Sequence, residues 1–304
     1  MAGGIIGTGN HPKSLWPGIH AHFGRIYDQH EEEWSKIFDV KTSTQHYEED
    51  VQITGFGLVP VKPEGRSVEF TSETQGWLKR YTHIVYGMGY IVTREEEDDN
   101  LYEKVSKTRS GSLAFAMRQT EENVCANVLN RATDTNYTGG DGSVLMVGTH
   151  TSKAGSWSNI LSPAADLSET ALEDLIIMVY GAKDDMGLQI KLMPQSLIVP
   201  KEEWFEANRI LQSVLQNDTA LNAQNVLKST NALPGGVVMN HYLTDTDAFF
   251  IKTNCMNGMT YFLRRGYEFT VDSDFSSENM LAKATKRYSV GWTDWRSLYG
   301  SPGV

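Results

Sequence analysis

The chain has 304 residues and a formal net charge of −11 at neutral pH, with 40% hydrophobic and 21% charged residues. These proportions are ordinary for a folded protein and exclude wholesale disorder. The negative charge, with no long block of lysine and arginine, excludes grip on a nucleic-acid backbone as the main activity.

The cysteine content and the N-terminal sequence bear on the compartment. Two cysteines, Cys125 and Cys255, are too few for a disulfide framework, which fits a reducing compartment. The N-terminus lacks the basic and apolar segments of a secretory signal, and no window approaches the roughly 18 apolar residues of a membrane span. We therefore expect a soluble intracellular protein with no membrane contact.

The first 36 residues combine glycine and proline with large apolar side chains such as Trp16 and Phe23. Glycine and proline discourage regular structure, so we expect an irregular arm that lies across its own or a neighbouring molecule. Residues 31–38 then favour a short helix containing Trp34. A flexible tail, which is the alternative for this arm, is usually more polar.

Two β-rich stretches, residues 51–61 and 80–92, flank a polar segment at residues 62–79. Their composition and alternation predict the two strands of a projecting hairpin. Two strands bury too little surface to be stable alone. This hairpin therefore implies a partner surface.

A long helical pattern runs from Thr93 to Ala132. Thr93 and Glu96 have capping-box spacing, and the acidic residues that follow suit the positive end of a helix dipole. Serine and glycine at residues 110–112 are poor helix formers, so we expect a short acidic helix, a bend near residues 106–111 and a main helix at 110–132.

The second half of the chain alternates helical and strand patterns, which predicts a mixed α/β subdomain. Thr170 and Glu173 have capping-box spacing at the start of a helix that ends at Gly181. The other expected elements are a buried strand at 191–199, a helix at 200–215, paired strands at 237–243 and 247–254, and a strand at 259–271.

No standard catalytic signature is present, so we expect no catalytic, cofactor or metal site. His20 and His22 lack a third metal ligand nearby. The carboxylates at residues 95–99 are explained by the helix dipole, and nothing local supports Cys255 as a nucleophile. The C-terminal group Trp292, Trp295, Arg296 and Tyr299 fits either a core or an interface.

Three stretches of the second half carry a family resemblance through their order along the chain. They are residues 192–200 with Glu202 and Glu203, residues 242–245 with 248–250, and a C-terminal set of Arg264, Arg265, Glu268, Phe269, Asp274, Phe275, Asn279, Lys283, 287–296 and 300–301. On these residues the chain resembles the major capsid proteins of tailed bacteriophages, and especially the Mu-type major head subunits.

The resemblance implies an α+β, Hong Kong 97-like capsid fold. Its parts would be an N-terminal arm at 1–44, an extended loop at 45–92, a peripheral domain with a spine helix at 93–150 and 259–304, and an axial domain at 151–258. Eight residues of the arm and the loop are the candidates for contact between subunits: Trp16, Phe23, Trp34, Lys62, Glu64, Arg66, Trp77 and Arg80.

The implied function is structural and not enzymatic. Copies would assemble as hexamers and pentamers into an icosahedral shell around double-stranded DNA, which they would contact non-specifically. A separate scaffolding protein, a portal and a decoration protein would be partners, and assembly in the host cytoplasm would yield a virion. No cross-linking pair is evident, so we expect noncovalent joints. The alternatives are an encapsulin-like compartment and a soluble hydrolase.

Overall fold

The computed structural model describes residues 16–98, 102–215, 224–274, 276 and 278–304. The chain forms two compact units, of which the first comprises residues 1–32, 83–123 and 263–288, and the second the remaining residues. Helix α3 (Tyr102–Asn130) and strands β10 (Met259–Ser273) and β11 (Met280–Trp292) supply residues to both units. The bounds of these two units differ from those of the four segments expected from the sequence. The division into four segments therefore stays a prediction.

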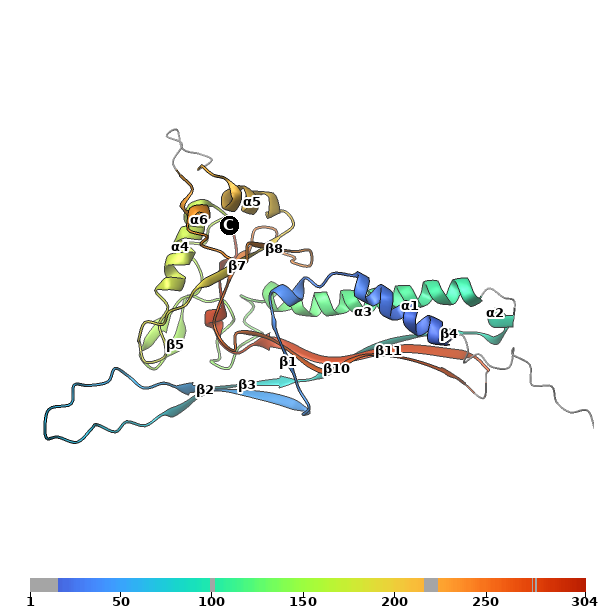
Figure 1. Cartoon of the computed structure of the whole chain (residues 1–304), viewed down its shortest axis with the longest axis horizontal. Helices are drawn as coiled ribbons and strands as arrows, with labels where there is room; N and C mark the ends of the chain where they lie inside the picture. Colours follow the sequence, from blue (N-terminus) through green and yellow to red (C-terminus); the bar gives the residue numbers. More distant parts are fainter. Residues whose placement is uncertain (1–15, 99–101, 216–223, 275, 277) are drawn as a thin grey trace, which may run out of the picture. The chain divides into compact units, whose positions relative to one another are not determined.

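The first unit is built from long strands covered by helices (Figure 1). Its strands belong to a sheet of order β1-β10-β11-β4, in which β4 is Ile84–Val92 and β1 (Asp39–Thr42) is a strand of the second unit. Strand β4 pairs antiparallel with β11 from Met280↔Val92 to Tyr288↔Ile84. The core joins α1, α3 and the strands through the residues Phe23, Tyr27, Val92, Leu113, Ala114, Met117, Phe269, Val271, Met280, Ala282 and Ala284.

Part of the expected irregular arm is instead helix α1 (Trp16–Gln29). Pro17 lies in the first turn, where its missing N–H is tolerated because those amides have no partner within the helix. Phe23 and Tyr27 lie one turn apart on the buried face, and Phe23 stacks on Phe269 with ring centroids 4.7 Å apart. The remainder of the arm, residues 1–15, lies outside the described residues.

The acidic helix α2 (Arg94–Asp98) is present, and the amide of Glu96 donates to Thr93 Oγ1. The bend expected near residues 106–111 is wrong, because α3 is continuous over 29 residues. Gly111 faces α1, and a Cβ there would lie 2.8 Å from Ile26 Cδ1. Glycine at this position therefore lets two helices approach closely and does not break the helix.

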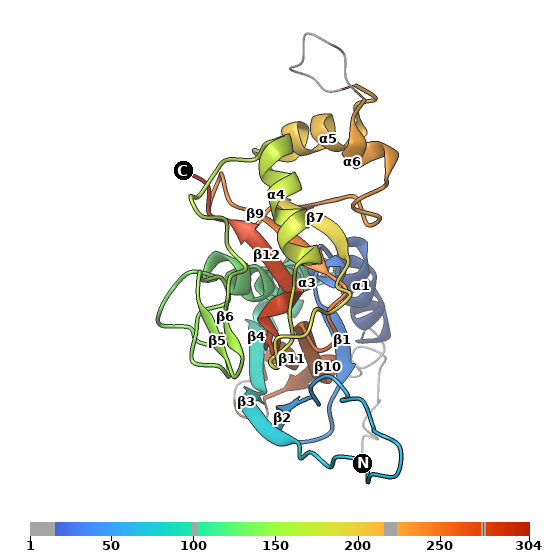
Figure 2. The ribbon, with the colours of Figure 1, turned by 90° about the vertical axis from the view of Figure 1, so that its left-hand side faces the viewer.

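The second unit contains a sheet of order β12-β9-β7-β8, of which β12, β9 and β7 are labelled in Figure 2. These strands are β7 (Pro194–Pro200), β8 (Val237–Asn240), β9 (Phe249–Thr253) and β12 (Leu298–Ser301). The expected strands at 237–243 and 247–254 exist, but they do not pair with each other. Strand β7 lies between them, parallel to β8 and antiparallel to β9.

Helices α4 (Glu169–Tyr180), α5 (Trp204–Gln212) and α6 (Val226–Ser229) accompany this sheet. The N-cap of α4 is Ser168, whose Oγ accepts from the amide of Ala171, so the expected capping box at Thr170 is wrong. Leucines of α4 pack with Val199 and Ile251 in the core of this unit. The other elements are 3-10 helices Trp34–Lys36 and Trp295–Ser297, and strands β2 (Tyr47–Thr54), β3 (Thr74–Thr82), β5 (His150–Ser152) and β6 (Gly155–Trp157).

The C-terminal aromatic group is part of the core of the second unit. Trp292, Trp295 and Tyr299 are buried, and the Trp295 ring stacks on His150 with centroids 4.2 Å apart. Arg296 pairs with Asp185 at 2.8 Å and with Asp294 at 3.1 Å. Of the two roles open from the sequence, the structure therefore assigns the core.

Replacing Trp295 with alanine is expected to lower the free energy of unfolding by about 3 kcal/mol, because it empties a buried site. Trp295 is only 3% exposed, so the variant loses almost all the packing contacts of this ring and leaves a cavity. Chemical denaturation of the unassembled chain measures the change. An unchanged denaturation midpoint would contradict the burial of this ring.

Candidate inter-subunit surfaces

Strands β2 and β3 form a two-stranded antiparallel ribbon, paired from Tyr47↔Thr82 to Thr54↔Thr74. Residues 55–73 join the strands and are here called the tip of the ribbon (Figure 1). The expected hairpin is therefore present, but its strands are residues 47–54 and 74–82 instead of 51–61 and 80–92. Its first strand ends before the tip, and residues 84–92 belong to the sheet of the first unit.

The tip exposes large apolar side chains to an unusual degree. Leu58, Val59, Val61 and Phe70 are each between 83% and 93% exposed. A soluble monomer seldom presents several such residues together, because the contact of apolar surface with water is unfavourable. The tip therefore has the character of a segment that another surface covers.

Strand β4 is a second surface of this kind. It forms one edge of its sheet, and residues 84–92 contain neither a charged residue nor a proline. Ile84, Val85, Met88 and Ile91 are each more than half exposed. Natural sheet edges usually carry charge, proline or a bulge that prevents pairing with another strand. This edge lacks the first two and is suited to pairing with another chain.

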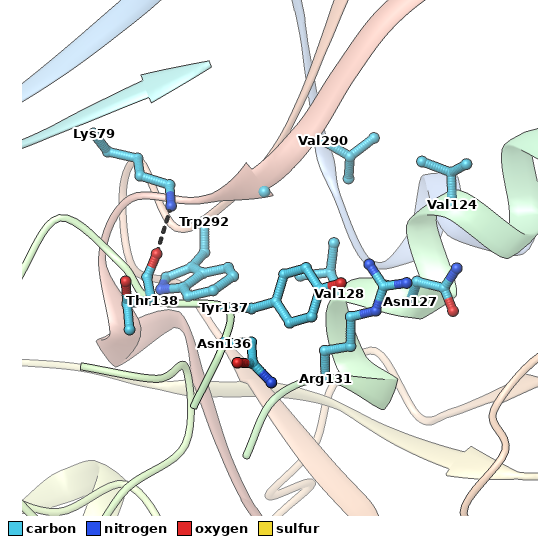
Figure 3. Close-up of a pocket in the computed structure, with 11 residues that line it drawn as sticks. Lys79, Val124, Asn127, Val128, Arg131, Asn136, Tyr137, Thr138, Val290 and Trp292 are labelled. Carbon is cyan, nitrogen blue, oxygen red and sulfur yellow. Dashed lines mark hydrogen bonds between the residues drawn. The ribbon is translucent and has the colours of Figure 1, made fainter. Parts of the chain in front are cut away.

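A pocket of about 380 Å³ lies in the second unit where the end of α3 meets Lys79 of β3 and Trp292 of β11 (Figure 3). We call it the cation pocket, and its lining is Lys79, Val124, Asn127, Val128, Arg131, Asn136, Tyr137, Thr138, Val290, Gly291 and Trp292. The Arg131 guanidinium lies 4.3 Å from the centre of the Tyr137 ring. Lys79 Nζ donates to the carbonyl oxygen of Thr138 at 2.9 Å.

Comparison with protein families identifies the chain. The family model described as phage capsid protein matches residues 78–301, which is more than half of the sequence. The chain belongs to the phage capsid protein family. Among curated proteins, none matches this capsid protein.

Solved structures show which fold the capsid protein has. It is similar to the capsid of a native GTA particle, at 12% identity and a TM-score of 0.54, covering 89% of this chain and 90% of that one. It is also similar to a virus-like particle from Pyrococcus furiosus, at 10% identity and a TM-score of 0.51, covering 94% and 99%. Microbacterium phage Oxtober96 gives 10% identity, a TM-score of 0.50, and coverage of 88% and 90%.

These matches confirm the α+β Hong Kong 97-like fold and the capsid function expected from the sequence. The capsid protein is a major shell protein that associates with itself and has a structural role in the virion. A virus-like particle has a similar fold, so the fold does not by itself distinguish a phage capsid from a compartment. The family match favours a capsid over the compartment and hydrolase alternatives. The assignment to the Mu type stays a prediction.

The structure places the eight candidate contact residues in different surroundings. Phe23 is fully buried and Trp34 is 4% exposed, stacked on Tyr261 at 4.1 Å. Their interpretation as contacts with a neighbour is wrong, because their side chains are used within their own chain. Trp16 begins α1, but its side chain lies outside the described residues.

The remaining candidates belong to the ribbon. Lys62, Glu64 and Arg66 are exposed on the tip, so they stay candidates. Trp77 is half-buried, and its ring would lie 2.7 Å from a Cβ at Gly140. Arg80 pairs with Glu49 at 2.6 Å and lies 4.3 Å from the centre of the Tyr47 ring. Its side chain therefore makes its contacts within the ribbon.

Sequence reasoning missed the apolar part of the tip and the edge of β4. The β-branched and apolar content of residues 51–61 predicts a strand over that whole range, but β2 ends at Thr54. The signal against that interpretation was the closely spaced Gly55, Gly57 and Pro60, which interrupt strand pairing. An apolar run broken in this way fits an exposed recognition segment better than a paired strand.

The structure describes the surroundings of some of the residues considered for chemistry. His20 packs against Phe269 with ring centroids 5.0 Å apart, and the Asp98 side chain lies outside the described residues. Burial raises the pKa of the Cys255 thiol far above its usual range, which disfavours the nucleophilic thiolate. Within the described residues, no three metal-ligating side chains gather, and no helix combines the length and hydropathy that a bilayer crossing requires.

An acidic cluster surrounds Glu203, just before α5. Its members are Asp166, Glu202, Glu203, Glu206 and Asp247. Partial burial, followed by repulsion from Asp247 and the other carboxylates, raises the pKa of Glu203. The folded chain thus ionises this group less readily than the unfolded chain, which destabilises the folded state at neutral pH.

Glu203→Gln is therefore expected to stabilise the chain by about 0.5 kcal/mol at pH 7, a small value because solvent screens the repulsion. The sign follows from the raised pKa: the penalty is fully present above the folded pKa and vanishes below the ordinary value of 4.5. Urea denaturation at pH 7 and pH 4 tests this. Glu173→Gln on α4, outside the cluster, is the control and should give no such pH-dependent gain.

Proposed function

We propose that many copies of this capsid protein assemble as hexamers and pentamers into an icosahedral shell around double-stranded DNA. In this shell, the ribbon of each copy lies on a neighbouring copy. The exposure of Leu58, Val59, Val61 and Phe70 carries the proposal, because their contact with water is relieved only when another surface covers them.

The edge of β4 is the second proposed contact, through backbone hydrogen bonds with another chain. Each contact alone is modest. A copy held at several edges nevertheless dissociates rarely, because release at one edge leaves it held at the others. Weak single contacts also let misplaced copies leave during assembly.

The proposed partners other than the chain itself are a separate scaffolding protein, a portal and a decoration protein. The net charge of −11 supports only non-specific contact with the packaged DNA, since a like-charged wall does not bind the cargo tightly. Assembly is proposed to take place in the host cytoplasm without cofactors, catalysis or covalent joints.

Electron microscopy of the expressed chain, with and without the scaffold gene from its neighbourhood, tests the proposal. We expect closed shells of uniform diameter when the scaffold is present. Only monomers in both preparations, measured by light scattering, would contradict it. Shells that enclose an enzyme in place of DNA would favour the compartment alternative.

A further inference from the structure

The cation pocket holds two positive groups that form no ion pair in the described part of the chain, although the charge of Asp141 acts on Lys79. No carboxylate among the described residues pairs with Lys79 or Arg131. Lys79 Nζ contacts the Thr138 carbonyl and lies 4.8 Å from the centre of the Trp292 ring. Arg131 stacks on Tyr137, which leaves its N–H groups available (Figure 3).

The surroundings of Lys79 favour an incoming anion. Burial lowers the pKa of Lys79, although the charge of Asp141 opposes this. A cation that has lost part of its water gains more from a carboxylate than an exposed one does. Asn127 adds an amide group to the same lining, whereas the Asn136 amide already donates to Asp134 at 2.8 Å. Val124 and Val128 add apolar surface.

A carboxylate side chain suits this pocket better than a DNA phosphate. Proteins hold duplex backbones with many exposed lysines and arginines, and this chain carries a net charge of −11. Here two cations lie in a recess of about 380 Å³ with aromatic walls. A side chain can enter such a recess, whereas a duplex backbone stays outside.

We propose that the cation pocket receives an acidic side chain from the ribbon tip of a second copy. This rests on the proposed function, in which the tip lies on a neighbour. Glu64, Glu69 and Glu73 are the carboxylates of the tip, and all three are exposed. Glu69 lies between Val68 and Phe70, so the tip offers charge beside apolar surface, as the pocket does.

Charge reversal tests the inference. Arg131→Glu is expected to lower the yield of shells about tenfold when the chain is expressed with its scaffold, because like charges then meet. Combining it with Glu64→Lys, Glu69→Lys or Glu73→Lys should restore shells for the carboxylate that enters the pocket. The control is Lys153→Glu, which makes the same charge change at an exposed residue outside the pocket and should leave the yield unchanged.

Arg131→Gln removes the charge without adding a negative one, and it is expected to lower the yield severalfold if Arg131→Glu does not fold. Circular dichroism of the unassembled variants separates misfolding from failed assembly. The inference is overturned if both Arg131 variants assemble like the wild type, or if no reversal on the tip restores shells. If the Arg131 variants form normal shells that no longer retain DNA, the pocket binds nucleic acid, and the inference is overturned as well. Wild-type chains that form no shells would instead refute the proposed function.

Discussion

A chain in which residues 57–71 are replaced by a short glycine–serine turn is expected to fold normally and to form no shells. The removed residues include Leu58, Val59, Val61 and Phe70, whose side chains are almost fully exposed. Their removal costs the isolated chain little, since they bury almost no surface within it. In a shell the same residues would bury their apolar surface, worth about 25 cal/mol for each Å².

The measurement is the fraction of chains that sediment as shells after expression with the scaffold, with circular dichroism as the test of folding. A matched control replaces the polar tip residues Ser67, Thr71 and Ser72 with alanine, which keeps the length and the apolar residues of the tip. The control should assemble. Normal shells from the shortened chain would refute the role of the tip.

Lys286→Met is expected to lower the free energy of unfolding by about 3 kcal/mol, because it removes one of the two cations that neutralise a buried carboxylate. Glu121 is fully buried in the first unit and pairs there with Lys286. The Tyr27 hydroxyl donates to Glu121 at 2.9 Å, and Arg118 lies 3.3 Å from it. Burial, followed by the Glu121 charge, raises the pKa of Tyr27 far above its usual range, so this phenol stays protonated.

Guanidinium denaturation of the unassembled chain measures this loss. Lys283→Met is the matched control, because it makes the same substitution on the same strand at an exposed position. Exposed charges of this kind contribute less than about 1 kcal/mol. Equal losses for the two variants would show that the buried ionic cluster adds no stability of its own.

The elements defined by local pattern were predictable from the sequence. The strand at 191–199, the acidic helix after Thr93 and the long strand from Met259 all follow from composition, periodicity and capping, and all are present. Local reasoning failed where tertiary contacts decide. Serine and glycine at residues 110–112 predict a bend near residues 106–111, yet Gly111 allows a close helix–helix contact with Ile26 that no local pattern shows.

The pairing of strands and the surfaces were less predictable for the same reason. Strands β8 and β9 are neighbours in sequence, but β7 separates them in the sheet. Lys286 and Glu121 are 165 residues apart, so no local pattern brings them together. The cation pocket likewise joins Lys79, Arg131 and Trp292 from three distant segments, and no spacing rule anticipates it.

The bare edge of β4 also matters for newly made chains that have not yet found a neighbour. An edge strand with exposed apolar side chains and no charge is a template for irregular stacking, which ends in insoluble aggregates. The danger grows with the concentration of free chains, because stacking requires encounters between them. Slow synthesis relative to shell growth would keep these chains soluble and able to assemble. Early shielding of residues 84–92 by a helper protein would have the same effect.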